Sequence, residues 1–399
     1  MRQPLPLQML AIFASLALHL MVRAEGEVIA HDKRNEDGIA AAIAIRDDHH
    51  LLNSREQRKA RRTEWMDALG LDLVLSYDSL ALGALGSDDG WGAASGDATM
   101  NLRWQINSDT SKAPLSLNLR ARHRHAYSDL APSELRSETG SLWGHVDGFT
   151  DAGFQVPEIF LEDKFFDQRL TLRYGQMTID DLLDGHQLRS AKRSFMNQAF
   201  ASSPAVGFPG SDLGLVTRWQ SRHGWDLTLA ASNLTGSNLR ESAEWKLDSG
   251  ALFQAAQLGY DFKGPRGRAS RVQLLAWRSD ASSELDLQPG RGFSLTLEHD
   301  WSPQIRSFFR YAWSDGDAAV TTHFAALGIA RDLRKTDRLG VAVAGGQSNK
   351  SKDAWEGVVE LFYRRQIGKS LLITPDVQFV TGSDAGALVV AGVRVGLTF

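Results

Sequence analysis

Hydrophobic and polar residues alternate with a period of two along most of the chain beyond residue 66. In residues 69–79, Leu71, Leu73 and Leu75 share one face, whereas Asp72 and Ser76 occupy the other. Successive side chains of a β-strand point to opposite faces, so this period predicts strands with one apolar and one polar face. No later segment is apolar and long enough to cross a bilayer as a helix.

Sixteen segments show the alternation, and most have the length of about 9 to 13 residues that a tilted strand needs to cross a hydrocarbon layer. They are residues 69–79, 97–107, 113–123, 156–165, 167–176, 213–220, 224–234, 251–261, 270–279, 291–301, 304–314, 321–331, 338–346, 355–366, 370–380 and 387–399. The alternation is blurred in four of them, 156–165, 251–261, 270–279 and 321–331.

The links between these segments alternate between short and long. The long links are expected at residues 80–96, 124–155, 177–212, 235–250, 280–290 and 347–354. Short turns on one side and long loops on the other are typical of bacterial outer-membrane barrels, and an even strand number leaves both termini on the periplasmic side. The pattern therefore predicts an all-β fold: a transmembrane antiparallel β-barrel of about sixteen strands occupying residues 66–399.

A soluble β-sandwich would also alternate, and the aromatic residues favour the barrel over it. Trp104, Trp301 and Tyr311 are among the aromatic residues that fall near strand ends, where aromatic girdles meet the lipid headgroups. The last segment ends on Phe399, and a terminal aromatic residue closing such a strand resembles the signal that the barrel-assembly machinery recognises. The expected location is the outer membrane of a Gram-negative cell, in contact with its lipid.

The N-terminus has the pattern of a secretory signal peptide. Arg2 precedes an apolar run from Leu5 to Val22, and Val22-Arg23-Ala24 predicts cleavage after Ala24. The alternative is an anchor that stays attached, but the run is short for a spanning helix and a charged stretch follows it. Residues 1–24 are therefore expected to be removed from the mature protein.

Residues 25–65 are crowded with charge and hardly alternate. We interpret them as a charged periplasmic extension: either a short solvated helix with a tether, or a plug-like segment. Without residues 1–24 the chain carries 42 basic and 48 acidic residues, a net charge of −6 that argues against a nucleic-acid partner. The chain has no cysteine, so the fold of this exported protein does not depend on disulfides.

The polar faces and the third long link supply the candidate site. A barrel of sixteen strands is wide enough to leave an aqueous lumen, and the loop 177–212 is the natural constriction. Opposed carboxylates and arginines would create a transverse field there; the alternative is that this loop only covers the mouth of the barrel. The candidate channel-lining residues are Arg103, Arg120, Arg122, Arg173, Arg218, Arg306 and Arg310 on the strands, with Asp180, Asp181 and Asp184 on the loop.

No catalytic constellation, metal-ligand motif or cofactor motif stands out in the chain. There is no nucleophile elbow, no His-Glu-x-x-His and no phosphate loop. We therefore expect no enzyme activity, no metal and no cofactor.

Several stretches resemble the carbohydrate-selective porin family, the OprB-like barrels. Residues 371–378 (LLITPDVQ) are similar to its penultimate-strand signature, and residues 172–176 (LRYGQ) to the strand that leads into its constriction loop. Residues 197–200 (NQAF) and 207–209 (GFP) resemble the body of that loop. The resemblance implies a sixteen-stranded channel for monosaccharides with arginines and acids at its eyelet. It marks Arg173 and the loop as the constriction and Asp376 as a motif position.

The leading hypothesis is an outer-membrane porin for passive diffusion of sugars or other small polar solutes. One alternative is an export channel for an anionic exopolysaccharide, because guanidinium groups match carboxylates. Another is a structural or adhesive barrel with a plugged lumen.

Overall fold

The computed structural model describes residues 66, 69–86, 91–106, 114–234, 250–282, 287–333, 336–351, 353–368, 370–383 and 386–399. The predicted signal peptide and the charged extension at residues 25–65 lie outside these residues. None of the helices in the described part of the chain is long and apolar enough to cross a membrane.

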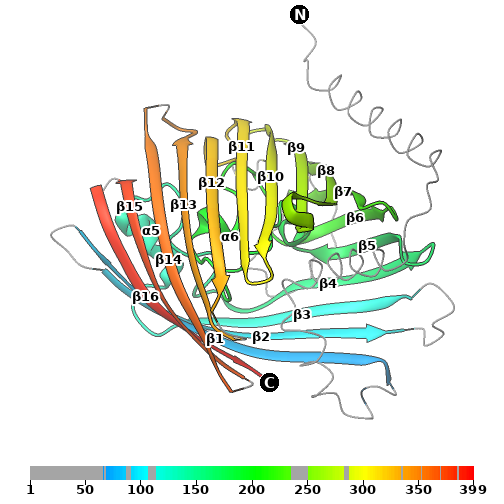
Figure 1. The fold of residues 1–399 in the computed structure, drawn as a ribbon, viewed down its shortest axis with the longest axis horizontal. Coiled ribbons are helices and arrows are strands. Elements are labelled where there is room, and N and C mark those ends of the chain that lie inside the picture. The colour runs from blue at the N-terminus through cyan, green and yellow to red at the C-terminus, as the bar shows by residue number, and fades with distance from the viewer. Residues whose placement is uncertain are drawn as a thin grey trace, which may run out of the picture. The chain divides into compact units, whose positions relative to one another are not determined.

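Sixteen antiparallel strands close into one barrel, in which each strand pairs with its neighbours in sequence (Figure 1). They are β1 (Leu71–Leu85), β2 (Trp91–Gln105), β3 (Ser116–Ala126), β4 (Gly153–Phe165), β5 (Leu170–Met177), β6 (Asp212–Gln220), β7 (Trp225–Asn233), β8 (Leu252–Lys263), β9 (Ala269–Ser279), β10 (Gly290–Ser302), β11 (Ile305–Gly316), β12 (Thr321–Asp332), β13 (Arg338–Ser348), β14 (Trp355–Ile367), β15 (Leu371–Ser383) and β16 (Gly386–Thr398). The predicted strand number is confirmed.

The first and last strands pair with each other and close the ring. Their register runs from Ser76 opposite Thr398 to Leu85 opposite Val389. The terminal residue extends this pairing, because the amide of Phe399 donates to the carbonyl of Leu75 at 2.9 Å. Closure leaves no unpaired sheet edge, so the strands satisfy one another's backbone groups, as a structure in hydrocarbon requires.

The predicted long link at residues 80–96 is wrong. β1 continues to Leu85 and β2 begins at Trp91, so only residues 86–90 connect them. The polar face disappears beyond Asp78 because Leu80 and Leu82, the next residues on that face, point inward and are buried. An apolar interior at this level removes the alternation on which the prediction depended, while the strand itself continues.

The outward face of the barrel is apolar. Leu327, Phe379 and Val393 are 52%, 52% and 44% exposed, as expected for side chains that meet lipid. Trp104 and Trp301 are also exposed and lie near the ends of β2 and β10. The apolar faces assigned from the sequence therefore point away from the lumen.

Two long loops contact the inner wall instead of lying above the barrel. The segment 127–152 carries η1 (Pro132–Glu134) and α5 (Leu135–Thr139), and the segment 178–211 carries η2 (Ile179–Leu182) and α6 (Gln198–Ala201). A further short turn, η3 (Pro265–Gly267), joins β8 to β9. Figure 1 shows α5 and α6 behind the strands of the front wall, and their side chains share a buried cluster with inward residues of β1, β2 and β11–β16.

Aromatic rings dominate that cluster. Phe195 of the second loop packs edge-on against Phe362 of β14, with ring centroids 4.9 Å apart. Trp143 of the first loop packs edge-on against Phe324 of β12 at 5.9 Å. Wall residues beneath the loops are thus apolar on both faces, which explains the blurred alternation in residues 321–331. A second cluster has the same effect on residues 270–279, through inward Leu275.

We predict that Phe362→Ala weakens the barrel from within. The side chain is fully buried, so its removal leaves a cavity and costs about 3–5 kcal/mol. Phe379→Ala, which deletes the same ring from the 52%-exposed outer face, is the matched control. The measurement is the temperature at which the folded barrel loses its compact gel mobility in detergent. An equal shift for both variants would contradict the packing of the loop against β14.

Candidate functional site

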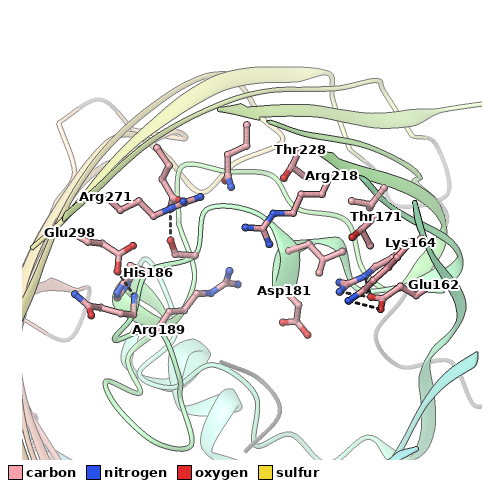
Figure 2. A pocket seen from close by; sticks show the side chains of 17 residues that line it. Glu162, Lys164, Thr171, Asp181, His186, Arg189, Arg218, Thr228, Arg271 and Glu298 are labelled. Carbon is pink, nitrogen blue, oxygen red and sulfur yellow. Dashed lines mark hydrogen bonds and ion pairs between the residues drawn. The ribbon is translucent and has the colours of Figure 1, made fainter. Parts of the chain in front are cut away.

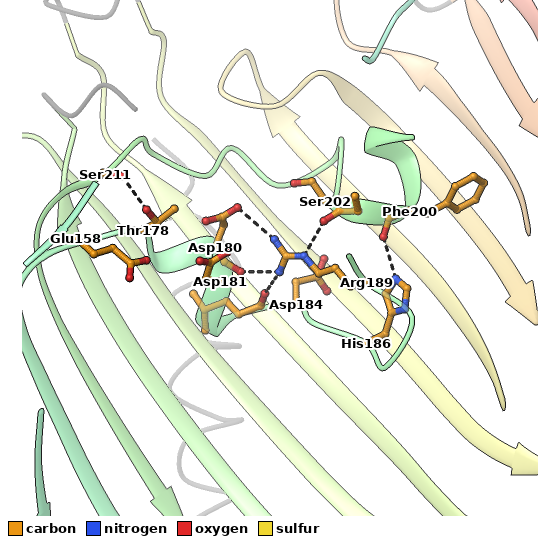
Figure 3. Close-up of polar contacts among 12 residues, drawn as sticks. Glu158, Thr178, Asp180, Asp181, Asp184, His186, Arg189, Phe200, Ser202 and Ser211 are labelled. Carbon is orange, nitrogen blue, oxygen red and sulfur yellow. Dashed lines mark hydrogen bonds and ion pairs between the residues drawn. The ribbon is translucent and has the colours of Figure 1, made fainter. Parts of the chain in front are cut away.

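The loop between β5 and β6 is built around one arginine. Arg189 donates from Nη1 to the carbonyls of Asp180 at 2.6 Å and Leu183 at 2.9 Å. Its Nε donates to the carbonyl of Ala201 at 2.7 Å, and its Nη2 lies 3.2 Å from Oδ2 of Asp180 (Figure 3). One side chain therefore ties η2 at the start of the loop to the end of α6.

The short helices of both loops have local sequence causes. α6 begins after Asn197, whose side chain accepts a hydrogen bond from the amide of Ala199 at 2.9 Å. α5 ends at Thr139 and is followed by Gly140, which adopts the left-handed conformation with φ of 61°. Neither helix is long enough to be stable alone, so tertiary contacts must hold both loops.

Charged side chains of the wall bind the backbone of the second loop. The carboxylate of Glu360 accepts from the amides of Met196 at 2.6 Å and Asn197 at 3.0 Å. Arg394 donates to the carbonyl of Ser194 at 2.6 Å. Backbone groups of an irregular segment that is buried away from water need such partners. These wall residues replace the water that the loop loses by folding inward.

The first loop is held in the same way. Glu356 of β14 accepts from the hydroxyl of Ser141 at 2.7 Å and from the amide of Leu142 at 2.6 Å. Gln378 of β15 donates to the carbonyl of His145 at 2.8 Å. Burial lowers the pKa of His145 to about 4, so its imidazole is neutral at physiological pH.

A polar hollow lies between the second loop and the wall formed by β4 to β10 (Figure 2). Its lining residues are Glu162, Lys164, Thr171, Arg173, Asp181, Leu182, Gly185, His186, Gln187, Arg189, Val216, Arg218, Thr228, Gln257, Arg271, Gln273 and Glu298. Five are basic, three are acidic, and most of the others carry hydroxyl or amide groups. The hollow thus presents many hydrogen-bond donors and acceptors beside apolar surface from residues such as Leu182 and Val216.

The charges around the hollow are organised by shared carboxylates. Glu162 contacts Arg173 at 2.8 Å, Arg103 at 3.0 Å and Lys164 at 3.7 Å. Asp226 contacts Arg271 at 2.7 Å, and Arg218 at 3.8 Å. Each carboxylate contacts cations from different strands, and these ion pairs fix the positions of the charged side chains on the wall.

The candidate residues fall into separate groups. Arg173, Arg218 and Asp181 line the hollow. Arg120 lies 2.8 Å from Asp181 and 3.0 Å from Glu158, and Arg103 reaches Glu162. The structure thus brings four of the predicted arginines and one loop carboxylate to this region.

The remaining candidates lie elsewhere. Arg310 is completely buried, where it donates to the carbonyl of Asp184 at 2.6 Å and lies 3.4 Å from that residue's carboxylate. Arg306 pairs with Asp332 at 3.3 Å, and Arg122 donates to Gln155 at 3.2 Å. Arg310 and Asp184 therefore fasten the loop to the wall, beneath its surface.

Several lining residues were missed by the sequence reasoning. Lys164, Thr171 and Thr228 lie on inward faces of predicted strands, but only the strand register brings them into one row across the wall. Glu162 lies in residues 156–165, where the alternation is blurred. The polar face of each segment showed that these residues point inward. Nothing in the sequence distinguished the positions that line the hollow from the other polar positions.

Asp180 is a loop carboxyl whose charge should change near neutral pH. Burial, and then the negative charge of Asp181, raise the pKa of Asp180 to about 7, although Arg189 opposes this effect. The folded protein holds this proton more tightly than the unfolded chain, so the contribution of Asp180 to stability falls as the pH rises from the ordinary carboxyl range through about 7.

We predict that ion selectivity changes with pH through this residue. Raising the pH from about 6 to about 8 adds a negative charge beside Asp181, so the preference for anions over cations should decrease. The reversal potential in a salt gradient measures it. Asp180→Asn cannot ionise at this position and should show a smaller change over this interval. A pH response of the same size in the Asn variant would assign the titration to another group.

Comparisons with known proteins identify the family. A family model of the carbohydrate-selective porin, OprB family, matches residues 128–399. The high-pH structure of Pseudomonas putida OprB matches with a TM-score of 0.70 at 17% identity, covering 84% of this chain and 96% of that chain. The low-pH structure of the same porin gives a TM-score of 0.54 at 14% identity, with coverage of 84% and 94%.

A mutant of the Rh. blastica porin is a more distant structural match, with a TM-score of 0.51, 11% identity and coverage of 82% and 100%. No curated protein matches the sequence. The structural matches, all at low identity, show a common fold, and the family model covers more than half of the chain. The chain is an outer-membrane β-barrel that belongs to the carbohydrate-selective porin family, OprB.

Proposed function

We propose that this porin lets small carbohydrates diffuse passively across the outer membrane. The observation that carries the proposal is the polar hollow between β4–β10 and the loop 178–211, whose lining offers donors and acceptors on all sides. Membership of the carbohydrate-selective family supports the same solute class. We further propose that the protein acts as a channel without enzyme activity.

Permeation in such a site depends on exchange of hydrogen bonds. A sugar hydroxyl leaves water and bonds to Arg, Thr or Gln side chains, each net bond being worth about 0.5–1.5 kcal/mol. Salt bridges such as Arg173–Glu162 at 2.8 Å hold these groups in fixed positions, so the solute does not have to order them. Several weak bonds select a sugar and still allow it to leave.

The loop 178–211 is proposed as the constriction. It contributes Asp181, His186 and Arg189 to the lining, opposite the wall residues Arg173 and Arg218. Because it is bonded to the wall along its length, it narrows the passage permanently and does not act as a lid. The family comparison gives no support to the alternative of exopolysaccharide export.

Single-channel recording in a planar bilayer tests the proposal. Stable current steps that glucose reduces in a dose-dependent manner are expected from the purified protein. Arg173→Ala should raise the half-blocking glucose concentration roughly threefold or more, because it removes a charged donor from the lining. A channel whose current no sugar reduces, in any variant, would refute the proposed function. Arg222→Ala, in the exposed turn after β6, removes the same charge at a distance and should leave the block unchanged.

A further inference from the structure

One row of paired side chains crosses five neighbouring strands on the wall of the hollow. The register places Lys164 of β4 opposite Thr171 of β5, and Thr171 opposite Arg218 of β6. Arg218 then lies opposite Thr228 of β7, and Thr228 opposite Gln257 of β8. All five residues line the hollow (Figure 2). We call them the basic row; it contains two cations, two hydroxyls and an amide, and no carboxylate.

Two carboxylates beside the basic row lie closer to cations outside the row than to the cations within it. Glu162 lies 3.7 Å from Lys164 but 2.8 Å from Arg173. Asp226 lies 3.8 Å from Arg218 but 2.7 Å from Arg271. In both cases the shorter, stronger contact goes to a cation outside the row.

Exposure differs between the two signs of charge. The side chains of Lys164 and Arg218 are 25% and 22% exposed, whereas those of Glu162 and Asp226 are 5% and 4% exposed. The two cations of the row are therefore more accessible than these two carboxylates. Along the basic row the wall presents positive charge to the solute.

The acidic residues that line the hollow elsewhere are already engaged. Asp181 of the loop lies 2.8 Å from Arg120, and Glu298 accepts from the amide of Gln187 at 2.7 Å and is buried. Their charge is directed at these partners, so it offsets the field of the basic row only in part.

We propose that the basic row binds monosaccharides that carry a carboxylate, and that the porin favours sugar acids over neutral sugars. The carboxylate takes charge-assisted hydrogen bonds from Lys164 and Arg218. The sugar hydroxyls bond to Thr171, Thr228 and Gln257, which lie between and beside the cations. Neighbouring strands are about 4.8 Å apart, so a pyranose ring matches the span of two or three of them.

This inference rests on the proposed function, since it assumes that sugars enter the hollow at all. Glucose and glucuronate form a matched pair of probes. They share one ring and differ only at C6, which is a hydroxymethyl group in glucose and a carboxylate in glucuronate. Acetate is the third probe, since it carries the carboxylate without the hydroxyls. Each is added to single channels in a planar bilayer, and its half-blocking concentration is measured.

In the wild-type channel, glucuronate should block at a concentration about tenfold lower than glucose, and acetate should block poorly. The double variant Lys164→Gln/Arg218→Gln should lose the preference, so that glucuronate and glucose block at similar concentrations. Arg222→Gln removes one charge from the exposed turn and should keep the preference. Heat-modifiable gel mobility checks that each variant is a folded barrel.

Different contrary results would overturn either the preference for sugar acids or the carbohydrate channel itself. Equal block by glucose and glucuronate in the wild-type channel would overturn the preference for sugar acids and leave the carbohydrate channel standing. No block by either would overturn the proposed function itself. Block by acetate as strong as that by glucuronate would show a bare anion site and overturn the sugar part. A preference that persists in the double variant would overturn the assignment to the basic row.

Single variants provide the same readout if the double variant does not assemble. Lys164→Gln alone should reduce the preference about threefold, and an unchanged preference would overturn its assignment. Thr171→Val removes a hydroxyl and keeps every charge. This variant should weaken the block by both sugars and leave the response to acetate unchanged. Equal weakening of the block by glucose, glucuronate and acetate would overturn the proposed contact between Thr171 and the sugar hydroxyls.

Discussion

A loop backbone that folds into a barrel must find hydrogen-bond partners there, and in this protein buried charges of the wall supply them. Glu360 accepts two consecutive loop amides, and Arg394 and Arg310 donate to loop carbonyls. Left unpaired, each buried group would cost about 1–3 kcal/mol. The position of the loop, and with it the form of the hollow, depends on these contacts.

The same constraint divides the inner wall into two kinds of surface. Beneath the loops, β11 to β16 present small or aromatic residues such as Ala326, Ala342 and Phe362, which pack against loop side chains. On the side of β4 to β10, inward residues such as Arg173 and Arg218 meet the hollow. The wall that holds the loops therefore combines apolar packing with the buried polar groups that bind the loop backbone, whereas the wall of the hollow is rich in charge where a solute passes in the proposed function.

The strands were predictable because lipid imposes one strictly apolar face on each of them. Residues 370–380 show why the reasoning works: Phe379 points outward, whereas Asp376 and Gln378 are buried inward. Where the interior is apolar as well, as at Leu80 and Leu82, the period-two signal vanishes although the strand continues.

The candidate site was predictable only in outline. Arg173 and Arg310 both lie on the polar faces of predicted strands. The sequence does not say which of them faces solvent and which is covered by a loop. The answer depends on contacts between residues far apart in the chain, such as Arg310 with Asp184. The basic row depends likewise on the register of five strands, which no local pattern determines.

The conductance of a Glu360→Ala channel tests most directly whether wall charges hold the loop in place. Without this carboxylate the amides of Met196 and Asn197 lose their acceptor, so the loop should leave the wall for part of the time. Single-channel records should then show a larger and noisier current than the wild type, with a folded barrel in both. A quiet channel of unchanged conductance would contradict the dependence of the passage on these contacts.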